Sequence, residues 1–510
     1  MKKTITISAA QEEAVTVDGL GVRKLNAGKV LYVLTAVYLA LPFCIFAFGW
    51  MKWWFAVPLV LVVAMGLIGM INHAPALWVP KLDRSFWWRF ALVAILVVGW
   101  VLMSGVGRFT WQNDDHDVRN ALFRILVENS WPVVELVPPE GLYDGPVALV
   151  YYIGFWLPSA LVGKFFGLAA GNIAQVVWAV LGILLFCWLA LAATLKKPRV
   201  WPVVIFILFS GMDILGCWVT GSFVDPITSA AHLERWGNPF QLSSMSTQLF
   251  WVYNQAIPAW VSTALILLQK NNRCLAFIVA LTALSSTLPA MGMVPLVIFV
   301  TLRNLRDTDA RPATISVKSF FKSVITYENV ICGGMVGVVS LLYLSSNNAG
   351  QHIGLRAALS GTNLLMWLLL LMFEVGVLFL LLFKFQRKNP LYWVILGSLV
   401  IFPWVGVGNG GDFGMRATIP ALVVLYFMVV MALAESFFKK QKLMFAGLCA
   451  VLTLGAVTAK NEIVRPMTMG AKLGSGSQTV ERHPFDTTWS DNFYGNMENS
   501  FFFEYLVKDS

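Results

Sequence analysis

The chain has 510 residues, of which 58% are hydrophobic and 13% are charged. A soluble domain carries about 25% charged residues, so this composition excludes an ordinary globular enzyme and indicates an integral membrane protein. The formal net charge of +10 does not indicate a nucleic-acid-binding protein, because the basic residues stand in short clusters between apolar segments, as in cytoplasmic loops.

The N-terminal segment, residues 1–29, is polar and mixed in charge. It lacks the small-residue cleavage site of a signal peptide, so we expect it to form a cytoplasmic tail. The six cysteines lie in or at the ends of apolar segments and form no C-x-x-C pair. No disulfide or zinc framework is therefore predicted.

Apolar segments long enough to cross a hydrocarbon layer of about 30 Å follow along the chain. They begin near residues 31, 53, 90, 200, 249, 329, 362, 391, 419 and 443. Residues 274–302 predict two short helices joined by a turn at Pro289. Residues 147–194 predict one full span with a partly inserted first half. The fold predicted for residues 30–459 is an all-α transmembrane bundle with about 13 crossings, or about 15 if residues 147–194 cross three times.

Basic loops assign one face of this bundle to the cytoplasm. They are VPKLDRSFWWR, LKKPR, QKNNR, the stretch 303–322, KFQRK and FKKQK. The opposite, extracytoplasmic face then carries the loops 107–146, 220–248, 346–361 and 408–418 and the C-terminal tail 460–510. Within the tail, GSGSQ predicts a flexible link.

An acidic cluster stands in the first outward loop, in FTWQNDDHDVRN at 109–120. The apolar residues that follow recur at helical spacing and predict a helix along the membrane surface. One interpretation of Asp114, Asp115 and Asp117 is a helix cap. The other is a site that binds a metal or moves a proton, because crowded carboxylates need a shared cation or proton. In that case Asp115, Asp117 and His116 would hold a divalent metal, Mg²⁺ or Mn²⁺.

The segment 144–165 carries Tyr151, Tyr152 and Trp156 close to a predicted membrane boundary. Aromatic residues in this position are typical of an interfacial belt. Lys164 lies deep in the apolar run, where it either snorkels to the cytoplasm or meets a phosphate.

The segment 229–260 mixes polar and aromatic residues before a membrane entry. This mixture suits a sugar, which has a hydrogen-bonding rim and an apolar face, although a solvated loop is equally polar. The polar candidates for substrate binding are His232, Glu234, Arg235, Asn254 and Gln255.

A glycine-rich outward segment, 405–420, places Asp412 beside Arg416. Glycines allow close approach to a ligand, and an arginine there can hold a phosphate. The alternative is a flexible turn with solvated charges. Two further acids, Asp213 and Glu374, lie within predicted spans, where an acid is a functional candidate or bonds between helices.

Five motifs run through most of the chain: DHDVRN at 115, WP at 131, YYIGFWLP at 151, LFWVYNQ at 249 and FFFEYL at 501. With an acidic outward loop, a surface helix and a late arginine loop, they resemble the polytopic glycosyltransferases of the GT-C superfold, and more narrowly bacterial membrane proteins that share these motifs. The resemblance implies a polyprenyl-phosphate sugar donor, a glycan or lipid-linked acceptor and action at the outer face of the bacterial inner membrane.

The same resemblance implies roles for individual residues. Asp115 would be the general base on the acceptor hydroxyl, assisted by Asp114 or Asp117. The donor phosphate would be held by a metal or by basic side chains, for which the candidates are Arg416, Arg356 and Arg235. The acidic loop follows the third predicted crossing here, whereas in the superfold it usually follows the first.

Two other functions remain open. A transporter or flippase of lipid-linked saccharides would need charges near the midplane, of which Glu374 is the clear example, and such proteins tend to show internal repeats, which this sequence lacks. A metal-free O-antigen-type polymerase or ligase would depend on arginine and histidine rather than on the aspartates.

Overall fold

The computed structural model describes residues 27–134, 137, 146–308, 316–347, 353–407, 412–473, 481–487, 490–497 and 500–508. The GSGSQ link and most of the predicted cytoplasmic tail lie outside these residues. The same holds for the glycine run at 408–411 and for parts of the outward loops 107–146 and 346–361.

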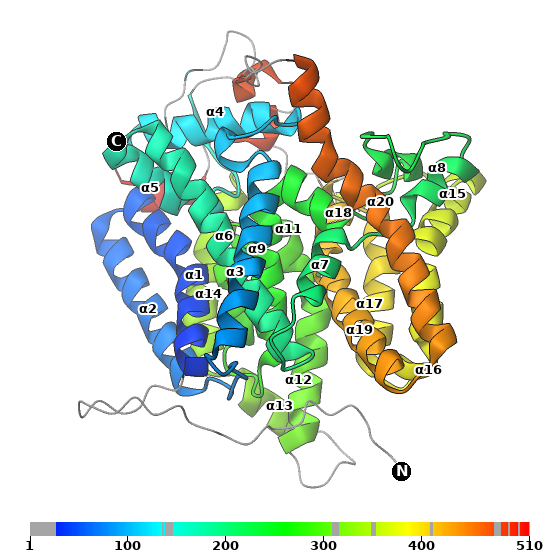
Figure 1. The fold of residues 1–510 in the computed structure, drawn as a ribbon. Coiled ribbons are helices and arrows are strands. Elements are labelled where there is room, and N and C mark those ends of the chain that lie inside the picture. The colour runs from blue at the N-terminus through cyan, green and yellow to red at the C-terminus, as the bar shows by residue number, and fades with distance from the viewer. Residues whose placement is uncertain are drawn as a thin grey trace.

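Long apolar helices dominate the described chain, which confirms the predicted all-α bundle and indicates a multi-pass membrane protein (Figure 1). Within the described ranges, nine helices are long and apolar enough to cross a membrane, or ten if Val317–Val324 and Glu328–Leu344, bent by 61°, are one span. The predicted number of about 13 crossings stays a prediction. The nine are α1 (Ala27–Trp50), α2 (Trp53–Asn72), α3 (Arg84–Met103), α6 (Leu168–Ala193), Trp201–Val219, Thr287–Arg306, Gly361–Gln386, Asp412–Phe438 and Lys442–Gly470.

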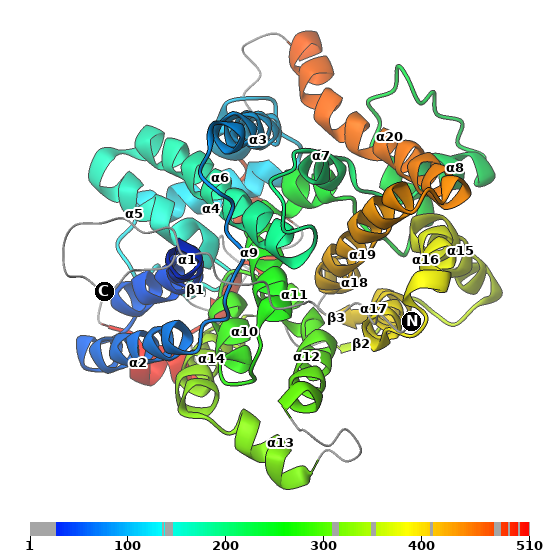
Figure 2. The same cartoon turned by 60° about the horizontal axis from the view of Figure 1, so that its bottom comes forward.

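The centre of the bundle is α9 (Met245–Leu268), which is buried continuously from residue 252 to its end. Figure 2 shows α9, α10 (Leu275–Ala283) and α11 (Thr287–Gly292) between two groups of helices. One group holds α1 to α6 and the other holds α15 (Gly361–Leu371) to α20 (Lys442–Leu473). Most of the buried side chains of α9 are apolar, as expected in a core position, but Gln248, Asn254 and Gln255 are buried among them.

Two segments, residues 147–194 and 274–302, form successive helices as predicted, but in the second the break between helices lies at a different position. Residues 147–194 form the ten-residue α5 (Leu157–Phe166) and then the 26-residue α6, of which only α6 is among the candidate spans of the described chain. In 274–302 the predicted turn at Pro289 is wrong, because the chain breaks at 284–286 and Pro289 lies in the first turn of α11. Proline is tolerated there, since the first turn has no acceptor for its missing N–H.

The C-terminal tail packs against the segments around α4 (Asp115–Glu128). Strand β4 (Tyr494–Asn496) pairs antiparallel with β1 (Val147–Leu149). The backbone N–H of Lys52 donates to the carbonyl of Leu506. Figure 1 shows α4 at one end of the bundle and α13 (Val317–Val324) at the other.

Three other elements complete the frame around the site. Strand β2 (Ile353–Leu355) pairs with β3 (Val405–Val407), which opens the glycine-rich segment 405–420. The short helix α18 (Asp412–Ala417) leads into α19 (Ile419–Phe438). Helix α20 runs unbroken through residue 460, so the predicted start of the outward tail falls inside a helix.

Candidate functional site

The acidic cluster lies at the N-terminus of α4. Asp115 is the first residue of the helix, and Asp114, in the capping position, makes no side-chain capping bond. The backbone N–H of Asp115 instead donates to Asn113 Oδ1 at 3.2 Å. The cap interpretation of the aspartates is therefore not supported by the contacts of these side chains.

Asp115 forms an ion pair with an arginine of its own helix. Arg119 Nη2 lies 2.8 Å from Asp115 Oδ2, one helical turn away. Arg119 is buried, whereas the side chain of Asp115 is 40% exposed. Arg119 Nη1 is buried without a protein partner among the described residues. A buried N–H without a partner is rare, and it marks a position where a ligand oxygen would be favourable.

Arg416 approaches the same place from α18. Its Nη2 lies 2.7 Å from Asp412 Oδ2, and its Nη1 donates to the hydroxyl of Tyr152 at 2.6 Å. The guanidinium lies 5.7 Å from the centre of the Tyr152 ring, and the charge of Asp115 acts on it as well. Arg416 is buried, and within the described chain its Nε has no partner. Segments far apart in sequence thus bring together two partly exposed carboxylates, Asp115 and Asp412, and two buried arginines that each keep one nitrogen without a described partner.

Close helix packing positions Arg416. An added Cβ on Gly292 of α11 would lie 2.0 Å from the backbone carbonyl oxygen of Ala417 in α18. Only glycine allows this approach. The adjacent wall is aromatic, because the rings of Tyr151 and Tyr152 are 3.8 Å apart and Phe493 of the tail lies 5.0 Å from Tyr151. Tyr151 and Trp156 are buried, so the prediction that they form an interfacial belt is wrong.

The proposed metal ligands point in different directions. His116 Nε2 is 3.1 Å from the carbonyl oxygen of Phe250, and its Nδ1 is 3.2 Å from Gln112 Nε2. Burial lowers the pKa of His116 to about 3. Asp117 Oδ1 is buried without a partner in the described structure, and burial together with the nearby Asp114 raises its pKa. In the residues that the structure describes, no three His, Cys, Asp or Glu side chains are grouped to hold a metal. A centre that includes His116 does not fit this donor set.

His232 belongs to a second cluster. Its Nδ1 lies 2.7 Å from Glu462 Oε1, which also accepts from Arg465 Nη2 at 2.9 Å. Glu462 Oε2 accepts from the indole of Trp251 at 3.0 Å. Burial opposes charge on the imidazole, but Glu462 raises the pKa of His232. Glu462 and Arg465 were not among the predicted site residues, because a predicted boundary at residue 460 assigned them to the outward tail.

Glu234 belongs to a third, acidic cluster. Its carboxylate accepts from the backbone N–H of Ser244 and from Gln241 Nε2, each at 2.8 Å. Burial and the charge of Asp213 raise the pKa of Glu234 to about 7. Asp213 accepts from the indole of Trp236 at 2.9 Å and from the hydroxyl of Thr458 at 2.8 Å.

Glu374 completes this acidic cluster. It lies in a π-helical turn (Met372–Gly376) between α15 and α16 (Val377–Gln386). An added Cβ on Gly211, in the break between α7 (Trp201–Leu208) and α8 (Asp213–Val219), would lie 2.0 Å from Glu374 Oε2. Glu374 Oε1 is buried without a partner in the described part of the chain. The two expectations for this acid, a functional role or a bond between helices, stay predictions.

The remaining candidates have contacts of their own. Lys164 donates to the carbonyl of Asn129 at the C-terminal end of α4, which favours a cation. It therefore points toward the end of the bundle that carries α4. Arg356 Nε donates to the carbonyl of Pro239 at 3.3 Å, and Arg235 is exposed. Asn254 and Gln255 are buried in α9; Gln255 has both amide atoms without a described partner.

Of the predicted residues, Asp115, Arg416 and Asp412 thus come together. His232 and Glu234 belong to two other clusters. Arg119 was missed, although its spacing of four residues from Asp115 on a predicted helix was a usable signal. Comparison of the chain with protein-family models, with curated proteins and with solved structures finds no match.

Proposed function

We propose that this protein is a membrane glycosyltransferase that moves a hexose or pentose from a polyprenyl-phosphate donor to a hydroxyl of a cell-envelope glycan or lipid-linked acceptor, at the outer face of the bacterial inner membrane. One observation carries the proposal. Two buried arginines, Arg119 and Arg416, each keep an N–H without a described partner, and the exposed carboxylate of Asp115 pairs with one and acts on the other. Forked arginine donors match a phosphate.

The chemistry assigns each group a task. The acceptor oxygen attacks the anomeric carbon as the bond from that carbon to the phosphate oxygen breaks. Asp115 takes the proton of the acceptor hydroxyl. The leaving lipid phosphate gains negative charge, which Arg416 and Arg119 stabilise. Attack from the face opposite the leaving group inverts the anomeric configuration.

A divalent metal at Asp115 and Asp117 stays a prediction from the sequence. The partly exposed Asp115 and the unpartnered oxygen of Asp117 are the available donors. Chelation with EDTA followed by addition of Mg²⁺ or Mn²⁺ tests it: loss and recovery of transfer would support a metal, and unchanged transfer would exclude the need for one.

The experiment for the proposed function is transfer from a panel of radiolabelled polyprenyl-phosphate hexoses and pentoses by the purified protein in vesicles. We expect Asp115→Asn to abolish transfer while Asp83→Asn, which removes the same charge from the N-terminal cap of α3, retains most of it. Full activity of Asp115→Asn at normal expression would exclude Asp115 as the base.

A transporter of lipid-linked saccharides is the second candidate, and the acidic cluster favours it. Asp213 and Glu374 lie at interruptions of helices in candidate spans, and Glu234 contacts the same region. Broken helices with buried acids are typical of ion-coupled transporters. Vesicles loaded with labelled donor distinguish the two candidates, because a transporter releases the donor intact on the opposite side whereas the enzyme cleaves it.

A further inference from the structure

A cavity of about 750 Å³ opens between α9, α12 (Val294–Thr308), α17 (Pro390–Ile401) and α19. This volume lies within the range of roughly 300–1,000 Å³ that ligand pockets occupy. Most of its wall is apolar, with Phe299, Leu391 and Phe427 among the lining side chains. Asp412 and Arg416 do not line it, so the cavity is distinct from the candidate transferase site.

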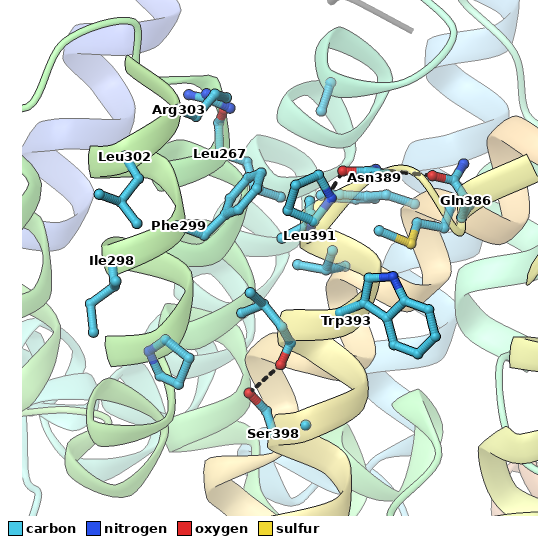
Figure 3. A pocket seen from close by; sticks show the side chains of 18 of the residues that line it. Leu267, Ile298, Phe299, Leu302, Arg303, Gln386, Asn389, Leu391, Trp393 and Ser398 are labelled. Carbon is cyan, nitrogen blue, oxygen red and sulfur yellow. Dashed lines mark hydrogen bonds between the residues drawn. The ribbon is translucent and has the colours of Figure 1, made fainter. Parts of the chain in front are cut away.

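One end of the cavity is basic. Lys270, Arg303 and Arg306 line it, and among the lining residues that the structure describes there is no aspartate or glutamate. Figure 3 shows Arg303 at the same end as Asn389 and Gln386, with Ser398 toward the opposite end. Arg303 Nη1 donates to the carbonyl oxygen of Leu267 at 3.0 Å, which holds its guanidinium in place at this end.

The side of the cavity is open to the surroundings of the bundle. Ile298, Trp393 and Ile401 line the cavity, yet they remain 55%, 50% and 59% exposed. Large apolar side chains exposed along a membrane-spanning bundle face lipid rather than water. A hydrocarbon chain can therefore enter sideways from the bilayer.

The basic end belongs to the loops that the positive-inside rule assigns to the cytoplasm. The cytoplasmic leaflet carries anionic lipids, and basic pockets between helices on that side bind their head groups. We propose that this cavity binds an anionic phospholipid of the cytoplasmic leaflet. The lipid phosphate lies among Lys270, Arg303 and Arg306, and one acyl chain extends along the apolar wall toward Ile401. A sugar or a nucleotide would leave its polar groups unpaired against that wall.

The chain itself supplies a matched set of variants. Lys270→Gln with Arg306→Gln removes two positive charges from the rim, whereas Lys318→Gln with Lys322→Gln removes two from α13, outside the cavity. Gly397→Phe fills the cavity without changing charge, because an added Cβ on Gly397 meets nothing within 4 Å.

Gly99→Phe is the matched control for the filling variant. Gly99 lies on α3, and an added Cβ there also meets nothing within 4 Å. It does not line the cavity.

The experiment is native mass spectrometry of the full chain, extracted from vesicles of equimolar phosphatidylglycerol and phosphatidylcholine. We expect one phosphatidylglycerol to be retained by the unaltered protein and by both control variants. The rim variant should lose about 25-fold in affinity, since each basic residue near an anionic head group contributes about fivefold. Gly397→Phe should lose retention altogether.

Four outcomes would overturn the proposal. Three are equal retention of phosphatidylcholine, equal losses in the two charge variants, and normal retention by Gly397→Phe. Displacement of the phosphatidylglycerol by an equimolar polyprenyl phosphate would assign the cavity to a different lipid and would also overturn it. None of these readouts depends on sugar transfer, so they leave the proposed enzymatic function untouched.

Discussion

Replacing Arg416 with glutamine removes a positive charge that, in the proposed mechanism, stabilises the negative charge of the leaving phosphate. The guanidinium is buried and donates to Tyr152 at 2.6 Å and to Asp412 at 2.7 Å, with Nε left over for a ligand. Loss of one preorganised donor at a developing oxyanion lowers kcat by about 10²–10³, which corresponds to about 2.7–4 kcal/mol. We expect a reduction of that size for Arg416→Gln.

The effect on folding should be smaller. The side chain of Asp412 is 48% exposed, so water can replace the lost ion pair. Tyr152 loses one hydrogen bond to a charged group. We therefore expect the free energy of unfolding to fall by only about 1–2 kcal/mol.

Arg416→Lys is expected to recover little activity, because an ammonium group cannot reproduce the directions of the three guanidinium nitrogens. Two assays separate the effects: kcat for transfer from a polyprenyl-phosphate sugar, and retention of a polyprenyl phosphate in native mass spectrometry. Arg356→Gln removes an equal charge from a different contact and should leave both near normal. A folded Arg416→Gln protein with unaltered kcat and phosphate retention would refute the role of Arg416.

Three further predictions concern stability. Burial raises the pKa of Glu234 from 4.5 to about 7. Between these pH values the folded protein holds a proton that the unfolded chain has lost, so folding takes up a proton. The free energy of unfolding should therefore fall by up to about 3 kcal/mol as the pH rises through this range. Thermal unfolding at several pH values measures this, and a slope that persists in Glu234→Gln would assign it to another group. Gly292→Ala should lower the free energy of unfolding by about 1–3 kcal/mol, because the added Cβ would lie 2.0 Å from a backbone carbonyl oxygen. Gly397→Ala, where the added Cβ meets nothing within 4 Å, should leave this free energy unchanged or raise it by up to about 1 kcal/mol. Equal unfolding temperatures for the two variants would contradict the close packing at Gly292. Glu481 holds the tail through Arg124, with Nε to Oε2 at 2.6 Å, so Glu481→Gln should speed proteolysis after residue 473, and a cleavage rate equal to that of the unaltered chain would show that other contacts hold the tail.

The local sequence pattern was sufficient to predict a helix wherever one physical constraint dominates. Apolar length predicted the long helices, because a chain in lipid must satisfy its backbone hydrogen bonds internally. The spacing after the aspartates predicted α4 because one face of that helix is apolar. The break near residue 285 was misplaced by a few residues, since Pro289 suits both a turn and the first turn of a helix.

The candidate site shows where local pattern was insufficient. Asp115 and Arg416 were each identified as charged residues in outward segments, but nothing in either segment specifies the other. Tyr151 resembled an interfacial aromatic, but Trp156, Tyr343 and Phe493 of the tail all contact it in the fold, and it is buried. Glu462 and Arg465 resembled solvated charges in the sequence, but both lie on α20, which continues to residue 473.

The sequence by itself determined that this protein is an all-α membrane bundle with its acids and arginines gathered between apolar segments, because the thickness and polarity of a bilayer act on each segment separately. The tertiary structure alone decided which charges meet. The approach of α11 to α18 at Gly292 and the hydrogen bond from Arg416 to Tyr152 place partners from distant segments within reach of one another. Such contacts depend on how helices pack, and packing is a property of the whole fold rather than of any one segment.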